Sequence, residues 1–282
     1  MPNRPDLANI GILSTSTKYL DKPVTYNFVI YDKYPDLHIA QVTINRPDVL
    51  NALNPAANQE LEDVWDNFAS DPDLWVAILT GAGDRAFTVG NDLKDRSSES
   101  WPPKRGPSGW GGLVTRFDLW KPVIAAVNGY ALGGGLEICL ACDIIIASEN
   151  ASFGCPEVRI GGVPTNAIHR LLRQIPTKAA MAMMFTGKPI DADEAFRIGL
   201  VNEVTAPDQL LERAQEWAVE ITKSAPLGVQ SIKEVAFKGQ GMSIEEAMLQ
   251  NYESIERVRA SQDSKEGRSA FAEKRKPKWQ GR

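Results

Sequence analysis

The chain has 282 residues, of which 43% are hydrophobic and 24% are charged, and its net charge is -5. This is the usage of a globular protein that can bury a sizeable core, either as one large domain or as a core with an appendage. The negative charge disfavours nucleic acid as the main partner, no apolar run approaches the roughly 18 residues of a membrane helix, and the N-terminus lacks the apolar segment of a signal peptide.

The first elements follow a short extension. Residues 1–24 have mixed charge and no clear period, which predicts an N-terminal extension. Strand-like runs rich in β-branched and aromatic residues follow at Thr25–Tyr31 and Ile39–Ile44. Asn54 then supplies a helix N-cap, with Pro55 at the first helical position. The core-facing stripe of this predicted helix consists of Leu61, Val64, Trp65 and Phe68.

Three more short apolar runs predict buried strands at Trp75–Leu79, Pro122–Val127 and Asp143–Ser148, with a glycine-led helix between the last two. Strands that alternate with helices indicate an α/β fold. We divide the chain into the extension at 1–24, an α/β core at 25–206 and a helical region at 207–282.

The stretch Ala86–Lys94 ends a predicted strand at Gly90. A glycine allows the backbone to turn there and to present the N–H of Asn91 outward. This N–H could serve as an oxyanion donor beside that of Gly134. The alternative is an ordinary Gly-Asn-Asp turn without a function.

Residues 95–121 are rich in Ser, Pro and Gly, yet they carry Trp101, Trp110 and Trp120. A polar loop of this length inside a compact domain is either disordered or functional, and tryptophans indicate that it packs on something. We therefore expect a lid over residues 97–120. The alternative is a surface excursion whose tryptophans pack on its own core.

The stretch Asn128–Glu137 contains three consecutive glycines, Gly133 to Gly135, at a strand-to-helix turn. Backbone N–H groups at a helix N-terminus lack intrahelical partners and can stabilise a developing oxyanion. Glu137 falls on the first helical turn, where it can face a bound group. The alternative is that the glycines only permit close packing and that Glu137 only favours the helix dipole.

The three cysteines are Cys139, Cys142 and Cys155, an odd number near one segment, which does not make a disulfide framework. Cys139 and Cys142 lie inside the apolar helix without a second ligand pair at metal-site spacing, so we expect buried structural thiols. We place the protein in the cytoplasm, with an organellar matrix as the alternative, and expect neither membrane nor nucleic acid as a partner.

A second candidate carboxylate, Glu157, stands in the loop that follows a predicted strand end at residues 151–154. Two carboxyl groups can act as general base and general acid when their environments keep one ionised and the other protonated. This chemistry requires no metal. The alternative is a solvated loop carboxylate. We expect no metal and no other resident cofactor.

The C-terminal third reads as helices. Asp191–Glu194 and Ser243–Glu246 each have a capping residue with glutamate three positions on. A last long helix carries an apolar stripe that we interpret as subunit packing, made of Ile244, Ala247, Met248, Tyr252, Ile255 and Val258. The basic tail Lys274–Lys278 could bind phosphates or form an unstructured terminus.

These stretches, in this order, resemble the crotonase family, also called the enoyl-CoA hydratase/isomerase family, over roughly residues 25–282. The matching motifs are Asn45-Arg46-Pro47, Asn51-Ala52-Leu53, Ala86-Phe87, Gly90 to Leu93, Asn128 to Glu137, Cys142-Asp143, Phe153-Gly154, Pro156-Glu157, Glu266-Gly267, Phe271 to Arg275 and Pro277. The tail and the segment from Gly106 into Lys121-Pro122 are particularly similar to carnitinyl-CoA dehydratases.

The resemblance implies a crotonase-like spiral of ββα units with a C-terminal helical region that builds a homotrimer or a dimer of trimers. It implies an oxyanion hole at the N–H groups of Asn91 and Gly134, with Glu137 and Glu157 as the catalytic pair. The expected partner is an acyl-CoA thioester, and coenzyme A would be part of that substrate. The expected substrate-binding residues are Asn51, Ala52, Asp92, Leu93, Lys94, Trp101, Trp110, Gly133, Pro164, Thr165 and Asn166.

The chain departs from the family after Pro164. Family hydratases commonly have a Gly-Gly-Thr run before an Arg-Leu pair, whereas here Thr165 to His169 precedes Arg170-Leu171 and is one residue shorter. We expect His169 to be a packed or surface residue. The expected reaction is hydration or dehydration of an enoyl-CoA; the alternatives are double-bond isomerisation, a carnitinyl-CoA-type dehydratase, or a trimeric binding protein without catalysis.

Overall fold

The computed structural model describes residues 26–94 and 106–282. The predicted extension at 1–24, the predicted strand start at Thr25 and the candidate Trp101 therefore lie outside the described residues.

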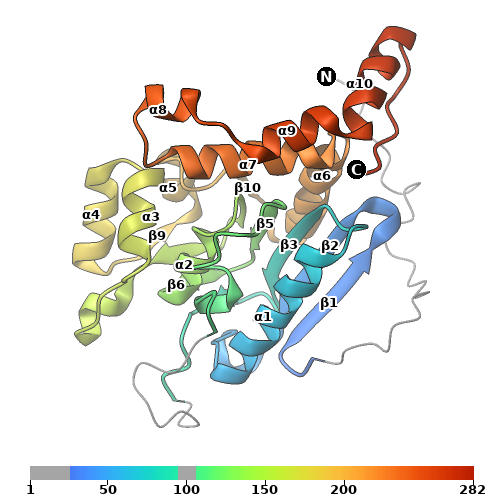
Figure 1. Cartoon of the computed structure of the whole chain (residues 1–282). Helices are drawn as coiled ribbons and strands as arrows, with labels where there is room; N and C mark the ends of the chain where they lie inside the picture. Colours follow the sequence, from blue (N-terminus) through green and yellow to red (C-terminus); the bar gives the residue numbers. More distant parts are fainter. Residues whose placement is uncertain (1–25, 95–105) are drawn as a thin grey trace.

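Two sheets form the core of the protein (Figure 1). The larger sheet has the order β1-β2-β3-β5-β7-β10, and its strands are β1 (Val29–Tyr34), β2 (Ile39–Ile44), β3 (Val76–Gly81), β5 (Val123–Val127), β7 (Ile144–Ser148) and β10 (Glu203–Thr205). The smaller sheet has the order β4-β6-β8-β9, and its strands are β4 (Ala86–Thr88), β6 (Tyr130–Leu132), β8 (Ser152–Gly154) and β9 (Ile190–Asp191). The first predicted strand begins later than expected, at Val29, and the other predicted strands are confirmed within one or two residues.

From β3 to β8 successive strands alternate between the two sheets, which makes this part of the chain a spiral. β3, β5 and β7 enter the larger sheet, and each is followed by a short strand, β4, β6 or β8, in the smaller one. Neighbours pair in parallel, for example Ala77 with Val123 and Ile124 with Ile144. The pairs β1·β2 and β8·β9 are antiparallel. This arrangement confirms the predicted α/β spiral of ββα units.

The central strands β3, β5 and β7 of the larger sheet are buried on both faces, which explains why they are largely apolar. One face of β3 and β5 presents Ala77, Leu79 and Ala125 to the main core. The other face presents alternating residues such as Ile78 and Ile124 to α6 (Leu210–Thr222). α6 thus forms a layer of the core, although it falls in the predicted helical region at 207–282.

The helices that surround the sheets are α1 (Pro55–Ser70), α2 (Gly134–Cys139), α3 (Ala167–Gln174), α4 (Thr177–Thr186) and α5 (Ala192–Arg197). α1 begins as predicted, because the Asn54 side chain accepts a hydrogen bond from the Ala57 N–H at 2.8 Å and Pro55 occupies the first helical position. Its stripe, including Leu61 and Trp65, is buried in the main core.

The C-terminal helices α7 (Pro226–Gly239), α8 (Ile244–Leu249), α9 (Glu253–Ala260) and α10 (Gln262–Glu273) run along one end of the molecule (Figure 1). The prediction of one long helix from Ile244 to Val258 is wrong. Gln250 and Tyr252 adopt extended backbone angles and separate α8 from α9. The break buries Tyr252 and Ser254 against α7, where the Ser254 hydroxyl lies 3.1 Å from that of Ser231.

The basic tail folds back along α10, so the interpretation as an unstructured terminus is wrong. Arg275 binds both carboxylate oxygens of Glu266, at 2.6 and 2.9 Å. The N–H groups of Gln280 and Gly281 donate to the Asp263 carboxylate at 2.7 and 2.8 Å. Among the described residues no helix combines the length and the apolar character needed to cross a membrane.

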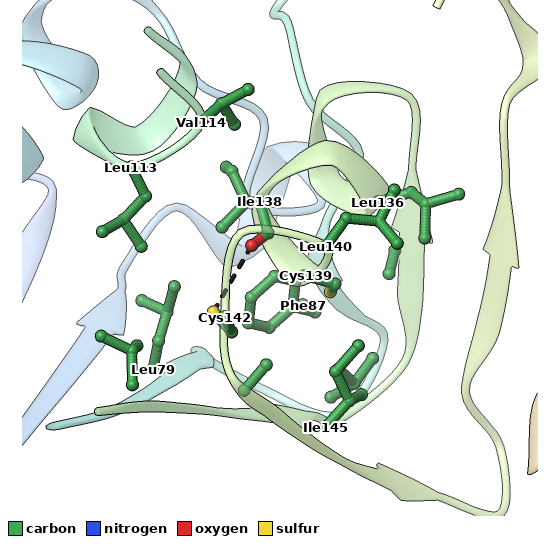
Figure 2. Close-up of a cluster of buried hydrophobic side chains, with 14 of the residues drawn as sticks. Leu79, Phe87, Leu113, Val114, Leu136, Ile138, Cys139, Leu140, Cys142 and Ile145 are labelled. Carbon is green, nitrogen blue, oxygen red and sulfur yellow. Dashed lines mark hydrogen bonds between the residues drawn. The ribbon is translucent and has the colours of Figure 1, made fainter. Parts of the chain in front are cut away.

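The cysteines are buried among apolar side chains, as predicted. Figure 2 shows Cys139 and Cys142 packed with Phe87 and Ile145, and the Cys142 thiol donates to the Ile138 carbonyl at 3.4 Å. Burial raises the pKa of Cys142 and of Cys139, which keeps both thiols protonated and unreactive.

Candidate active site

The turn at Gly90 and the N-terminus of α2 approach each other closely. Gly90 has a φ of 79°, and a β-carbon at this residue would lie 2.6 Å from the backbone nitrogen of Gly134. Real β-carbons do not approach other atoms so closely, and a side chain rarely adopts this φ. Glycine is therefore required at residue 90 for the two backbone segments to lie side by side.

This approach brings two backbone donors together. Leu53 donates to the Gly90 carbonyl at 2.7 Å and accepts from the Asp92 N–H at 3.1 Å. In this parallel bridge the N–H of Asn91 points away from Leu53. Gly134 is the first residue of α2, so its N–H has no intrahelical partner. Within residues 26–94 and 106–282, neither N–H donates to a protein acceptor.

Trp110 forms a wall beside this pair of donors. A β-carbon on Gly134 would lie 3.5 Å from the indole ring, and Trp110 itself is buried in the main core. Residues 108–114 of the tryptophan segment are buried in the core rather than raised over it, so the expectation of a lid is wrong for this part of the loop. The structure does bring Trp110 to the predicted site.

Polar side chains of α1 hold this segment in place. The Asn58 side chain accepts from the Gly111 N–H at 2.9 Å, and the Trp65 indole donates to the Gly111 carbonyl at 2.8 Å. The buried Glu62 carboxylate accepts from the Ser108 hydroxyl. These positioning residues were not predicted; the signal was two polar residues, Asn58 and Glu62, on the same helical face as Leu61 and Trp65.

Glu137 is buried at the junction of α2 and α3, with 3% of its surface exposed. Its Oε1 atom accepts from the backbone N–H groups of Asn166 and Ala167, at 2.9 and 3.2 Å. Its Oε2 atom accepts from the side-chain amide of Asn166 at 3.1 Å. All three partners donate, and donors stabilise a carboxylate in its ionised form.

Glu157 lies on a 3-10 helix, η5 (Pro156–Ile160), beside the glycine turn. A β-carbon on Gly133 would lie 3.3 Å from its Oε1 atom. Its Oε2 atom is buried and has no hydrogen-bond partner in the described part of the chain. Burial raises the pKa of Glu157; its own backbone N–H opposes this effect, and the charge of Glu137 adds to it. The two carboxylates thus have opposite environments.

Several predicted substrate-binding residues also make contacts that hold the fold together, and two are exposed. The Asn51 side chain is fully buried and donates to the carbonyls of Ala82 and Ala86, at 2.9 and 2.7 Å, which leaves it no surface for a substrate. Ala52 is also buried, and its carbonyl accepts from Arg46. Asp92 forms an ion pair with Arg46 at 3.0 Å. Leu93 and Lys94 are exposed beyond the turn.

The segment after Pro164 contacts the site by hydrogen bonds from Asn166 to Glu137. Pro164 is buried, Thr165 is exposed, and Asn166 is half-buried with its hydrogen bonds directed to Glu137. His169 is exposed on α3, as predicted. Gly133 adjoins both the donor pair and Glu157, so the structure brings together Asn91, Gly133, Gly134, Glu137, Glu157, Trp110 and Asn166.

The spiral of ββα units and the glycine-flanked donor pair define a crotonase-type protein. The family model for enoyl-CoA hydratase/isomerase matches residues 36–282, and the chain belongs to this family.

Relatives with assigned activities cover most of the chain. It is 42% identical over 250 residues to an (E)-benzylidenesuccinyl-CoA hydratase from Thauera aromatica, which covers 86% of this chain and 96% of that protein. It is 43% identical over 253 residues to a carnitinyl-CoA dehydratase from Escherichia coli, covering 86% of this chain and 95% of that protein.

Solved structures agree with the fold. An enoyl-CoA hydratase from Bacillus anthracis has a TM-score of 0.84 at 34% identity, covering 91% of this chain and 100% of that one. An enoyl-CoA hydratase from Mycobacterium tuberculosis has a TM-score of 0.82 at 37% identity, covering 90% and 99%. The family and the crotonase fold expected from the motifs are therefore confirmed.

Proposed function

We propose that the protein is a hydro-lyase that adds water to, or removes water from, the double bond of an enoyl-CoA thioester. The observation that carries the proposal is the placement of Glu137 and Glu157 around the one glycine turn that presents the Gly134 N–H. The relatives named as a hydratase and a dehydratase support the same reaction class. The scheme requires no metal or redox cofactor. Coenzyme A arrives as part of the substrate.

In the direction of hydration, the thioester oxygen would lie between the N–H groups of Asn91 and Gly134. A water oxygen bonds to the β-carbon, its proton passes to Glu137, and the π electrons move onto the thioester as an enolate. Glu157 then gives its proton to the α-carbon, and exchange with solvent restores both carboxyl groups. Stabilising the enolate is the central task, since one oxyanion donor is worth about 3 kcal/mol.

The two environments suit this division of work. A base must be ionised before reaction, and Glu137 is surrounded by donors. An acid must hold a proton, and the pKa of Glu157 is raised by burial. Both carboxylates would be needed for hydration, whereas a double-bond isomerase could work with Glu157 as its single base.

We also propose a homotrimer or a pair of trimers, located in the cytoplasm or an organellar matrix. Large apolar side chains on the C-terminal helices support assembly, since Ile244, Met248 and Phe271 are each at least 79% exposed. The three buried free thiols are typical of a reducing compartment. The basic tail at Lys274–Lys278 is proposed to bind coenzyme A phosphates.

A panel of acyl-CoA thioesters tests the reaction. It should include straight-chain enoyl-CoA esters of several lengths, benzylidenesuccinyl-CoA and carnitinyl-CoA, with the absorbance of the conjugated thioester as the readout. Loss of this absorbance with addition of water, or its gain with removal of water, supports the hydro-lyase. A shift of the double bond without water addition indicates the isomerase, and binding without turnover of any thioester indicates the non-catalytic binding protein.

A further inference from the structure

Asn166 occupies the N-cap of α3 but does not cap it. An asparagine at this place ordinarily accepts a hydrogen bond from an N–H of the first helical turn. Here the side chain makes no such bond, and its backbone is helical, with φ -93° and ψ -34°. Its amide instead donates to Glu137 Oε2 at 3.1 Å.

Glu137 takes over the capping of α3. Its Oε1 atom accepts from the N–H groups of Asn166 and Ala167, so a carboxylate from α2 closes the N-terminus of another helix. Two of its three donors are backbone groups that any residue at 166 and 167 other than proline would supply. The third donor, the amide of Asn166, depends on the side chain and lies in the segment that is shorter than in family hydratases.

We propose that Asn166 is a positioning residue that holds Glu137 ionised and fixes the direction of its Oε2 atom, rather than a group that binds the acyl chain. An ionised carboxylate only accepts hydrogen bonds, so the amide nitrogen must face it. A hydrogen bond to a charged group is stronger than a neutral one, and this bond lies at a buried carboxylate. Its role in catalysis rests on the proposed hydro-lyase function.

Other charged or titratable groups also interact with Glu137 and have to be kept constant. The charge of Glu137 influences the pKa of Glu157 on η5, of Cys155 immediately before η5, and of Arg170 on α3. Arg170 donates to the carbonyls of Leu140 and Val114, so it does not replace Asn166 as a donor to Glu137. Substitutions at Asn166 leave all three groups in place.

The test compares Asn166→Ala and Asn166→Asp with a matched control, Gln174→Ala. Gln174 also joins α3 to α2 through a side-chain amide, at 3.0 Å to the Leu140 carbonyl, but it does not touch a carboxylate. Asn166→Ala removes the donor, and the nearly isosteric Asn166→Asp replaces it with an acceptor of like charge. The control measures what loss of an interhelical amide does by itself.

The first readout is independent of activity. Glutamate carboxyl carbons are labelled with ¹³C, the Glu137 resonance is assigned with Glu137→Gln, and its chemical shift is followed against pH. We expect the Glu137 resonance to change at higher pH in Asn166→Ala than in the wild type, because the ionised carboxylate loses a hydrogen-bond donor. Asn166→Asp should shift it further, and Gln174→Ala should leave it unchanged.

The second readout is kinetic. On the best thioester of the panel, Asn166→Ala should lower kcat roughly tenfold or more with little change in KM, and the acid limb of kcat/KM should move to higher pH. An unchanged Glu137 titration in Asn166→Ala, or a change in KM alone, overturns the inference and makes Asn166 a substrate contact. An absence of turnover in the wild type overturns the hydro-lyase instead, and the carboxyl titration still decides the role of Asn166.

Discussion

Gly90 and Gly134, which are 44 residues apart in the sequence, meet so closely that a β-carbon on the first would lie 2.6 Å from the backbone nitrogen of the second. The contact fixes the two proposed oxyanion donors relative to each other, because any displacement of the Gly90 turn also displaces the N–H of Asn91. The distance between the donors is thus set by backbone packing and not by flexible side chains.

Gly90→Ala should therefore damage catalysis more than stability. The new methyl group forces the turn away from α2, and loss of one donor costs about 10²- to 10³-fold in kcat. Gly199→Ala is the matched control, because Gly199 has a φ of 81° and no atom within 4 Å of an added β-carbon. It carries the same backbone strain away from the site. Equal kcat in the two variants would contradict the oxyanion assignment.

Glu137→Gln and Glu157→Gln should each lower turnover in hydration by at least about a hundredfold, a typical contribution of general acid or base catalysis. Steady-state kinetics on the best thioester checks this, with the exposed Glu212→Gln as control. Near-normal hydration by Glu137→Gln would exclude the two-glutamate mechanism and favour the isomerase with Glu157 as its base.

Trp110→Ala should change the order of preference among acyl chains more than the rate on the smallest thioester. The indole borders Gly134, and a missing contact in an acyl pocket is worth roughly 1 to 3 kcal/mol of discrimination. The comparison is kcat/KM across the panel, with the half-buried Trp120→Ala as control. An unchanged ranking in Trp110→Ala would place chain-length selection at Thr165 or in the residues before Gly106.

Lys121 should make stability depend on pH in the alkaline range. Its ammonium donates to the Phe68 carbonyl at 2.7 Å and to that of Asp71, and burial lowers its pKa from 10.5 to about 8. Between these values the unfolded chain binds more protons than the folded one, so the free energy of unfolding rises with pH. Below pH 8 the unfavourable burial of the charge is present in full.

The measurement compares the wild type with Lys121→Met by urea unfolding at one fixed protein concentration, at about pH 7 and about pH 9.5. The free energy of unfolding of the wild type, minus that of Lys121→Met, should be larger at about pH 9.5 than at about pH 7. A difference that is constant, or that moves the other way, would show that Lys121 keeps an ordinary titration in the folded protein.

Met248→Asp and Ile244→Asp should weaken assembly. Both side chains are about four-fifths exposed in one protomer, at 80% and 79%, and a buried charge in an apolar interface is costly. Light scattering should return a trimer or hexamer for the wild type at micromolar concentration and a smaller mass for the variants. Gln250→Asp adds the same charge without removing apolar area. A monomer mass for the wild type would contradict the proposed assembly.

Sequence reasoning succeeded where one local signal fixes one local structure. The Asn54-Pro55 pair predicted the start of α1, and the glycine run at Gly133 predicted the strand-to-helix turn, because caps and glycine turns depend on few neighbours. The burial of Cys139 and Cys142 was predictable from the apolar residues around them in the sequence.

It failed where the outcome depends on distant partners. Asn51 belongs to a family motif, yet its side chain serves the backbone of residues 82 and 86, which the motif does not reveal. The apolar period continues through Gln250 while the helix does not, because burial of Tyr252 against α7 prevails over periodicity. Likewise, the Asn166 side-chain amide donates to a carboxylate 29 residues away in the sequence, that of Glu137.

The alternation of strands between two sheets also orders events during synthesis. β3, β5 and β7 each pair with a strand of the larger sheet that lies further along the chain, as Ala77 pairs with Val123. Such non-local pairing slows folding and leaves strand edges unpaired in the meantime. β10 is the last strand in the described chain, and α7 to α10 follow it. Both sheets can therefore close on the ribosome before the apolar helices that would recruit other subunits have emerged.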